Sequence, residues 1–217
     1  MYLVIEGAIG VGKTTLARLL QPVFNAHLQL EVFEENPFLA DFYTDRMRYA
    51  FQTQIFFLLS RYHQQRTIPE LISANTNLIS DYTFDKDYLF AGINLEGDEF
   101  EVYAQVHEAL AEKIPKPDLI IYLRADTDIL MQRIANRDRP YERNMEREYI
   151  DTLNQSYDNF FGDGHVRQKV LVIDTNELNY VAKPGDLKWV EERIRQTLKL
   201  PPFQSELPLD IPQEDYQ

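Results

Sequence analysis

Residues 2–15 read YLVIEGAIGVGKTT, and this stretch decides the fold. The apolar run from Tyr2 to Ile5 is typical of a buried strand, and a helix is expected from Lys13 to about Phe24. Between them the sequence matches G-x-x-x-x-G-K-S/T at every fixed position. The glycines allow backbone N–H groups to turn inward around phosphate oxygens, and the helix N-terminus adds partial positive charge. The stretch therefore predicts a phosphate-binding loop.

The residues of this loop have distinct expected roles. Lys13 should reach the β- and γ-phosphates of a nucleoside triphosphate, and the Thr14 hydroxyl should bind Mg²⁺. A glycine-rich turn without a ligand is the alternative, but the complete motif between a strand and a helix disfavours it. The motif indicates a triphosphate without specifying the reaction. We expect ATP and Mg²⁺ to bind at Gly7, Ala8, Ile9, Gly10, Val11, Gly12, Lys13, Thr14 and Thr15.

Outward from this loop, short apolar runs alternate with longer amphipathic segments, which is the pattern of an α/β fold. Further strands are expected at residues 28–33, 77–80, 119–123 and 169–173. Further helices are expected at residues 47–66, 98–114, 125–136, 148–161 and 187–198. We predict a three-layer P-loop fold with a five-stranded parallel sheet and helices on both faces. One domain should span residues 1–217, with a tail from about 201 to 217.

The expected helix at 47–66 has an apolar and a polar face. Gln54 and Arg61 are seven residues apart and share the polar face. An amide such as Gln54 can read the edge of a base, although a solvent-exposed face would produce the same pattern. The residues expected to be buried recur at spacings of three and four: Met47, Phe51, Ile55, Leu58 and Tyr62.

Composition excludes several classes of function. A net charge of −13 disfavours nucleic acid polymers and anionic membrane surfaces as partners. A small anion such as ATP can still bind through Mg²⁺ and a local positive pocket. The absence of cysteine excludes disulfides, thiolate metal sites and a cysteine nucleophile, and it fits a cytoplasmic location. The N-terminus does not resemble a signal peptide, and no apolar run approaches the roughly 20 residues of a membrane span.

An arginine-rich segment, residues 137–147, follows the expected helix at 125–136. Arg133 and Arg137 are four residues apart and share a helical face, and Arg139 follows them. Phosphoryl transfer requires positive charge because its transition state spreads negative charge over the γ-phosphate oxygens. We expect this segment to form a lid that closes on ATP. Pairing with glutamates of the same segment on a solvated surface would also explain the arginines.

Carboxylates lie at or just beyond the carboxyl ends of the second and third expected strands, where open α/β sheets bind ligands. Glu31 could accept the proton of an attacking hydroxyl group. Glu34 and Glu35 fit the same role by spacing, or could cap the next helix. Asp81 ends the third strand and is a candidate ligand of Mg²⁺ or of the acceptor hydroxyl.

With these residues in view, the chain resembles the deoxyribonucleoside kinases, especially the bacterial deoxyadenosine/deoxyguanosine kinases. The resemblance runs from about Tyr2 to Phe161 and is weaker afterwards. It rests on Ile5-Glu6-Gly7 before the loop, Glu31-x-x-Glu34 with Asn36-Pro37, Tyr43 with Tyr49-x-Phe51-x-x-Gln54 and Ser60-Arg61, and Arg133-Ile134-x-x-Arg137-x-Arg139-x-x-Glu142.

The resemblance implies transfer of the γ-phosphate of ATP to the 5′-hydroxyl of a deoxyribonucleoside. Glu31 would be the general base, and Lys13, Arg137 and Arg139 would complete the catalytic set. Arg133 would help Arg137 and Arg139 to clamp the ATP phosphates. The family also implies a homodimer formed through the long helices.

The resemblance further implies a nucleoside site. Gln54 would form paired hydrogen bonds with the base, Phe90 would stack under it, and an Arg61–Asp87 ion pair would lie beside it. Tyr43 and Glu142 would hold the sugar 3′-hydroxyl. The complete substrate set is Glu31, Tyr43, Gln54, Arg61, Asp81, Asp87, Phe90 and Glu142.

One position departs from the family pattern. Many members carry an arginine directly after the acidic residue that ends the third strand, whereas here Asp81 is followed by Tyr82. Tyrosine cannot donate a charged fork, so Lys86 or a lid arginine is the candidate substitute. The resemblance implies that an Arg61–Asp87 pair suits purines or cytosine better than thymine, and we expect deoxyadenosine or deoxyguanosine as the acceptor.

Three alternatives remain. A nucleoside monophosphate kinase such as thymidylate kinase would need arginines for its acceptor phosphate. Residues 31–45 contain five carboxylates and no lysine or arginine, which should repel a monophosphate. A non-catalytic nucleotide-binding P-loop protein would need neither an acceptor pocket nor a lid. A nucleoside triphosphate hydrolase would need a group that positions water, and the sequence contains no obvious one.

Overall fold

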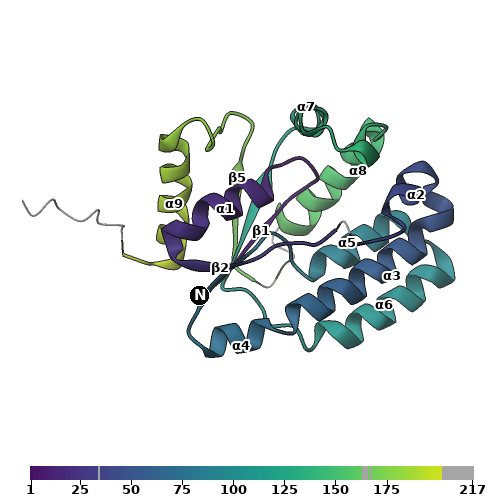
Figure 1. Ribbon diagram of the computed structural model, residues 1–217, viewed down its shortest axis with the longest axis horizontal. Coiled ribbons are helices and arrows are strands. Elements are labelled where there is room, and N and C mark those ends of the chain that lie inside the picture. The colour runs from purple at the N-terminus through teal and green to yellow at the C-terminus, as the bar shows by residue number, and fades with distance from the viewer. Residues whose placement is uncertain (34, 163–165, 167, 202–217) are drawn as a thin grey trace, which may run out of the picture.

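The computed structural model describes residues 1–33, 35–162, 166 and 168–201 (Figure 1). The strands of its sheet are all parallel and follow the order β2-β3-β1-β4-β5. The predicted five-stranded parallel sheet is therefore confirmed. The strands are β1 (Tyr2–Glu6), β2 (Ala26–Gln29), β3 (Asn77–Ser80), β4 (Leu119–Arg124) and β5 (Val170–Asp174).

Helices cover both faces of the sheet. Helix α1 packs against β1, β2, β3 and α9, whereas α3, α5, α6 and α8 form a connected layer on the other side (Figure 1). The helices are α1 (Lys13–Phe24), α2 (Leu39–Thr44), α3 (Arg46–Gln65), α4 (Ile68–Ser73), α5 (Asp85–Asn94), α6 (Gly97–Ala111), α7 (Thr127–Arg137), α8 (Arg147–Tyr157) and α9 (Pro184–Leu198).

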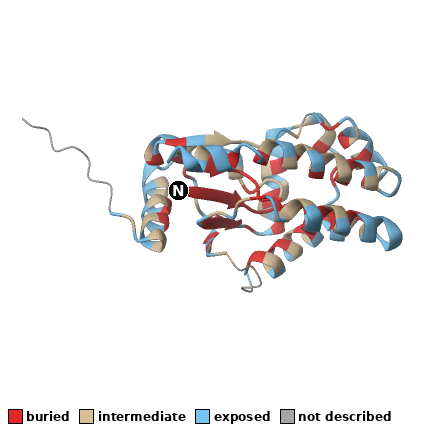
Figure 2. Ribbon diagram, turned by 90° about the horizontal axis from the view of Figure 1, so that it is seen from below, coloured by how far each residue is buried: buried red, intermediate tan, exposed pale blue. Residues whose placement is uncertain are grey.

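The central strands form the core. Every residue of β1 is buried, and β4 is buried except for its last residue, as the continuous apolar runs predicted (Figure 2). The register pairs Val4 of β1 with Ser80 of β3. The loop after β1 and Asp81 after β3 therefore leave the sheet at the same edge. This edge is where parallel sheets bind ligands.

Two local predictions are wrong. The second strand spans residues 26–29 and not 28–33, because the N–H of Glu31 donates to the Asp81 side chain and not to a neighbouring strand. The predicted buried face of α3 is correct at Leu58, which is fully buried, but wrong at Met47. Met47 is 95% exposed, whereas Gln54 and Arg61 are 2% and 4% exposed. Arg61 can be buried because Glu31 and Asp87 pair with its guanidinium.

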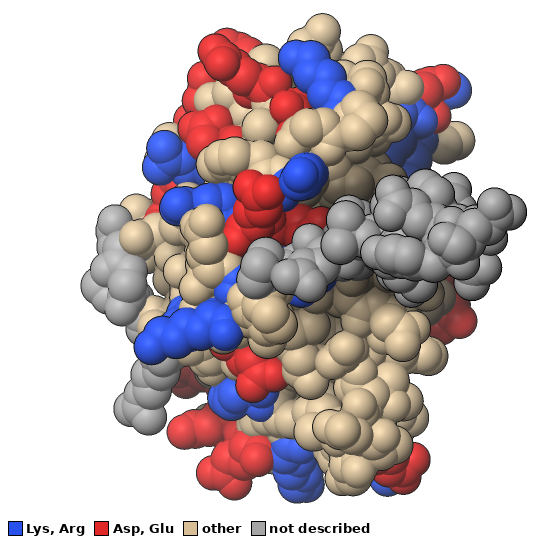
Figure 3. All heavy atoms as spheres, turned by 90° about the vertical axis from the view of Figure 1, so that its left-hand side faces the viewer, with Lys and Arg blue, Asp and Glu red and all other residues tan. Residues whose placement is uncertain are grey.

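Charged side chains of both signs share the surface of the molecule. On the face shown in Figure 3, lysines and arginines are interspersed with acidic side chains, unlike the continuous basic surface of a nucleic-acid-binding protein. No helix within the described part of the chain combines the length and apolarity needed to cross a bilayer.

Candidate active site

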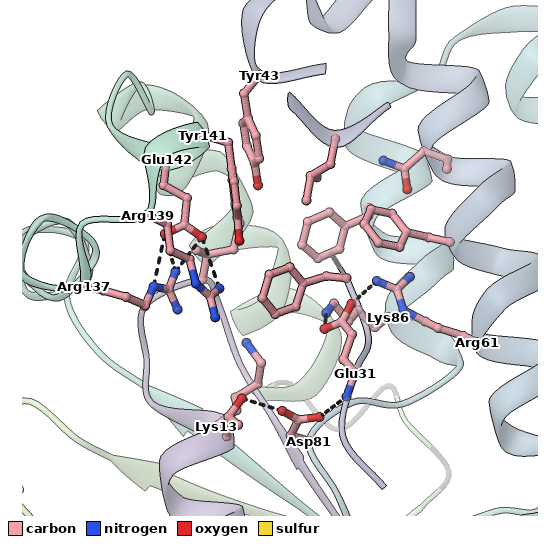
Figure 4. Close-up of a pocket in the computed structure, with 18 residues that line it drawn as sticks. Lys13, Glu31, Tyr43, Arg61, Asp81, Lys86, Arg137, Arg139, Tyr141 and Glu142 are labelled. Atoms are coloured by element: carbon pink, nitrogen blue, oxygen red, sulfur yellow. Dashed lines mark hydrogen bonds and ion pairs between the residues drawn. The ribbon is translucent and has the colours of Figure 1, made fainter. Parts of the chain in front are cut away.

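A cavity opens at the carboxyl edge of the sheet, between the phosphate-binding loop, α3, α5 and residues 137–142 (Figure 4). It has a volume of about 760 Å³, including the part open to solvent. The residues predicted for ATP and for the acceptor meet here, although they come from segments more than a hundred positions apart. The predicted residues that line it are Ile9, Gly10, Lys13, Thr14, Glu31, Tyr43, Gln54, Arg61, Asp81, Phe90, Arg137, Arg139 and Glu142.

The phosphate-binding loop depends on its glycines. Gly7 and Gly12 have φ angles of 146° and 102°, which side-chain-bearing residues rarely adopt. A Cβ atom on Gly7 would lie 2.4 Å from the carbonyl oxygen of Leu123. Lys13 Nζ folds over the loop and donates to the carbonyl oxygen of Gly7 at 2.7 Å. Burial and the nearby Lys86 ammonium lower the pKa of Lys13 to about 8.

Asp81 connects the loop to the acceptor side of the cavity. Its Oδ2 accepts a hydrogen bond from Thr14 Oγ1, and its Oδ1 accepts the backbone N–H of Glu31 at 2.8 Å. A hydroxyl and a carboxylate are the oxygen donors that Mg²⁺ prefers, and this ion usually takes few protein ligands beside waters and phosphates. Thr14 and Asp81 therefore fit a magnesium ion.

Four charged residues, Asp87, Arg61, Glu31 and Lys86, form a row that we call the buried charge chain. Arg61 pairs with both Glu31 and Asp87, and Lys86 Nζ lies 2.6 Å from Glu31 Oε2. Asp87 is fully buried behind Arg61 and does not line the cavity. Burial alone would raise the pKa of Glu31, but Arg61 and Lys86 outweigh it and hold that pKa well below its usual range. Glu31 is thus a carboxylate at neutral pH and can accept a proton.

Aromatic rings and one amide form the wall next to this chain. The Arg61 guanidinium lies 4.5 Å from the Phe57 ring centre, and the Lys86 ammonium lies 5.4 Å from that of Phe90. Gln54 lines the same cavity from α3. Flat apolar faces beside a bifunctional amide can hold a heterocyclic base by stacking and paired hydrogen bonds.

Tyrosines line the opposite side of the cavity. Tyr43 stacks on Tyr141 with a centroid distance of 6.0 Å and an interplanar angle of 13°. Burial raises the pKa of the Tyr43 hydroxyl well above its usual value, so it remains a neutral donor. This side can present hydroxyl groups to a sugar.

We call residues 137–147 the lid segment. Arg137 contacts Glu142 through two nitrogens, with Nη2 at 2.6 Å from Oε2, and Arg139 Nη1 lies 3.5 Å from Glu142 Oε1 (Figure 4). Arg139 also lies over the Phe33 ring at 4.2 Å. The pairing alternative considered from the sequence is therefore correct for Glu142. Since both arginines still line the cavity and are about one-third exposed, they can also reach an anion there.

Arg133 lies outside this cavity. It donates to the carbonyl oxygen of Thr175 at 2.6 Å and to that of Val11 at 3.3 Å. A second hollow of about 920 Å³, open to solvent, lies on this outer side of the loop. Its lining includes Arg133, Thr15, Val11 and Gly12 from the predicted ATP set, together with Tyr180 and Val181.

Sequence analysis missed several cavity residues. Phe33, Leu39, Phe57 and Tyr141 line the cavity but carry no motif, and an alternation pattern cannot tell a cavity wall from a core. Tyr82, at the position where the resemblance predicts an arginine, does not line the cavity and donates its hydroxyl to Gln64 Oε1 at 2.8 Å. Lys86, one of the two proposed substitutes, does line the cavity.

Among the described residues, the structure distinguishes Glu31 from Glu35 as candidate bases. Glu35 is exposed and does not line the cavity, and Glu34 lies outside the described residues. Asp41 and Asp45 are also exposed. The acidity of residues 31–45 therefore acts on the acceptor site only through Glu31 among the described carboxylates, which makes it a weak argument against a monophosphate.

Because the phosphate-binding loop and an acceptor carboxylate open into one cavity, the chain falls into the class of P-loop phosphotransferases. It belongs to the deoxynucleoside kinase family, since residues 3–199 match the family model "Deoxynucleoside kinase". This membership is stronger evidence than the local charge of residues 31–45 against a non-catalytic P-loop protein and against a thymidylate kinase.

Individual relatives agree with this assignment. Deoxyguanosine kinase from Bacillus subtilis (strain 168) is 31% identical over 201 residues, covering 91% of this chain and 97% of that protein. Deoxyadenosine kinase from Dictyostelium discoideum is 32% identical over 185 residues, covering 83% and 74%. The structure of deoxyadenosine kinase from M. mycoides with the products dCMP and a flexible dCDP aligns with a TM-score of 0.80 at 25% identity, covering 90% of this chain and 100% of that chain.

Proposed function

We propose that this protein transfers the γ-phosphate of ATP to the 5′-hydroxyl of a deoxyribonucleoside, preferably a purine one. The observation that carries this proposal is the position of Glu31. It lies between the phosphate-binding loop and the aromatic wall, in carboxylate form, where a hydroxyl acceptor can contact it. A nucleoside spanning the cavity would place its base against the wall and its 5′-oxygen near Glu31.

We assign the following roles to the residues on the basis of their positions in the cavity. Glu31 accepts the 5′-hydroxyl proton as that oxygen attacks the γ-phosphorus. Lys13 and the loop N–H groups hold the triphosphate, and Arg137 and Arg139 approach it from the lid segment. Thr14 and Asp81 hold Mg²⁺, which when bound neutralises negative charge on the phosphate oxygens. The nucleoside is held by Gln54 and Phe90 at the base and by Tyr43 and Glu142 at the sugar.

For the lid arginines, binding of ATP means an exchange of partners. Arg137 and Arg139 leave Glu142 at least in part when a triphosphate enters. Glu142 then becomes available to accept a hydrogen bond from the sugar 3′-hydroxyl. The two halves of the cavity are coupled in this way, because triphosphate binding frees a group that holds the acceptor. Movement of residues 137–147 as a lid within one domain belongs to this proposal.

A purine preference is supported by the wall and by the relatives. Gln54 and Arg61 offer both donors and an acceptor to a base edge. Relatives named deoxyguanosine kinase and deoxyadenosine kinase cover most of the chain. A solved deoxyadenosine kinase holds dCMP, so deoxycytidine is the competing acceptor to include in any test.

We further propose that the protein acts as a cytoplasmic homodimer formed through α3 and α6. These helices pack against each other, and Leu59 on α3 and Val102 on α6 expose large apolar side chains. Light scattering of the wild type and of Leu59→Glu tests this. A dimer that becomes a monomer in the variant supports the interface, and a monomeric wild type contradicts it.

The function is tested by measuring ADP release with Mg²⁺–ATP and a panel of acceptors. The panel contains the four deoxynucleosides, the matching ribonucleosides and the monophosphates. We expect turnover with deoxyguanosine or deoxyadenosine above that with deoxycytidine and thymidine. Turnover only with monophosphates, or ADP release that no acceptor stimulates, would contradict the proposal.

A further inference from the structure

Lys86 occupies a fixed position at the acceptor end of the cavity. It lies in the first turn of α5 and is 6% exposed. Its backbone N–H donates to Thr83 Oγ1 at 3.0 Å, and the backbone N–H of Thr83 donates to the buried carboxylate of Glu6 at 2.5 Å. The turn that carries Lys86 is thus anchored to the end of β1. A lysine ammonium would otherwise be mobile on its long stem, and here its Nζ is held 2.6 Å from Glu31 Oε2.

The charges of the buried charge chain alternate in sign. Asp87, which is fully buried, offsets Arg61, and Glu31 offsets Lys86. Arg61 therefore retains a carboxylate partner whatever happens to Glu31. Lys86 differs in this respect, since its ion pair depends on Glu31 being ionised.

The phosphoryl transfer changes the charge of Glu31. A bond forms between the 5′-oxygen and the γ-phosphorus, and the bond from that phosphorus to the β,γ-bridging oxygen breaks. The hydroxyl proton goes to Glu31, which becomes neutral. ATP leaves as ADP with one negative charge fewer on its phosphates, and the new phosphate ester carries two negative charges. Lys86 then faces a neutral acid on one side and the new ester on the other.

We propose that Lys86 is a catalytic residue that exchanges partners during the transfer, pairing with Glu31 before it and with the transferred phosphoryl group during and after it. The proposal rests on the proposed function, because it concerns the same transfer. A cation that gains its second partner only as the proton moves stabilises the transition state more than the bound substrates, which is the requirement for raising kcat. Because Lys86 is already desolvated and positioned, little reorganisation is needed.

A comparison of two ligands tests the exchange. Lys86→Gln retains a hydrogen-bond donor toward Glu31 but removes the charge. We expect its kcat to fall by about 100-fold, as for loss of a preorganised transition-state donor. In calorimetric titration, its affinity for the 5′-monophosphate should fall by about 10-fold or more, as for loss of a charge-assisted hydrogen bond. Its affinity for the deoxynucleoside should stay within about threefold of wild type.

Two further variants complete the experiment. Lys86→Arg keeps the charge and should recover a substantial part of both kcat and monophosphate affinity. Lys116→Met is the matched control, because Lys116 pairs with Asp85 at 3.7 Å but is exposed and does not line the cavity. It should behave as wild type. If Lys86→Gln does not fold, Lys86→Met is measured in the same two titrations.

The outcomes distinguish a catalytic role of Lys86 from a role that only holds Glu31 in place. An uncharged Lys86 variant with kcat close to wild type would overturn the proposal. An equal loss of affinity for deoxynucleoside and monophosphate would also overturn it, because Lys86 would then only hold Glu31 in place. Absence of turnover by the wild type with every acceptor would instead contradict the proposed function itself.

Discussion

The buried charge chain and the lid segment both place arginines at the cavity, but their environments differ. Side chains of the buried charge chain are at most 14% exposed, whereas those of the lid arginines range from 33% to 59%. Desolvated charges are costly to separate, and exposed pairs exchange partners at little cost. We therefore expect the buried charge chain to keep Glu31 in place, and the exposed lid arginines to change partners more easily even though Glu142 itself is buried.

The largest effect is expected at the base. Glu31→Gln removes the proton acceptor while keeping a polar group of the same size, so kcat should fall by about 10³-fold. ATP affinity should change little, because the phosphate-binding loop is untouched. Steady-state kinetics and ATP titration measure both. Glu35→Gln, at an exposed neighbouring carboxylate, is the control and should retain wild-type kcat. Full activity in Glu31→Gln would exclude Glu31 as the base.

The next effect tests how firmly the buried charge chain is held. Arg61→Met leaves the fully buried Asp87 without its cation, which should lower the free energy of unfolding by about 3–5 kcal/mol. Arg46→Met breaks the more exposed pair with Glu146 and should cost less than about 1 kcal/mol. Urea unfolding compares them. Adding Asp87→Asn to Arg61→Met should restore part of the loss. Equal costs for the two single variants would remove the distinction between buried and exposed pairs.

The lid segment should show the opposite behaviour. Arg139→Gln should lower kcat by about 100-fold, as for other groups that stabilise transferred phosphoryl charge, while the melting temperature stays close to wild type. Arg143→Gln is the matched control. Arg143 pairs with Asp138 in the same segment, is exposed and does not line the cavity, so its loss should leave kcat unchanged. Equal losses of kcat in both variants would show that kcat depends on the lid segment as a whole and not on the position of Arg139 at the cavity.

The smallest effect concerns His107, which lies outside the buried charge chain and packs against the rings of Phe84 and Tyr103. Burial lowers the pKa of His107 below its usual 6.5, so the unfolded chain binds this proton more readily than the folded protein. Stability is therefore fully present above about pH 6.5 and declines as pH falls toward the folded pKa, by at most about 1.4 kcal/mol per pH unit. His107→Gln should flatten this slope in urea unfolding between pH 7.5 and 5. An unchanged slope would assign the acid sensitivity to other groups.

The sequence predicted the phosphate-binding loop best because its requirements are local. Glycines at positive φ, a lysine and a hydroxyl must be adjacent in the chain to surround one phosphate group. The acceptor wall was predicted in part. Gln54 and Arg61 were predicted to share one face of α3. Their spacing alone fitted a solvent-exposed face equally well, and only the family resemblance placed them at the nucleoside. Met47 was wrongly predicted to be buried.

Phe57, Tyr141 and Lys86 illustrate what local patterns omit. Each is an ordinary residue of a helix or loop until the fold brings it to the cavity. Periodicity identifies which residues share a face, but it does not identify what that face meets. The polar side of α3 is buried because Asp87 and Glu31, distant in sequence, supply countercharges for Arg61.

By itself the sequence determined the parallel α/β sheet, the phosphate-binding loop and the class of triphosphate ligand, because hydrophobic period and loop chemistry act over a few residues. Only the tertiary structure decided that Glu31 rather than Glu35 lines the cavity, that Tyr82 does not line it, and that Lys86 pairs with Glu31. These outcomes depend on which charges meet across the sheet edge. Electrostatic pairing between residues far apart in the chain leaves no periodic trace in the sequence.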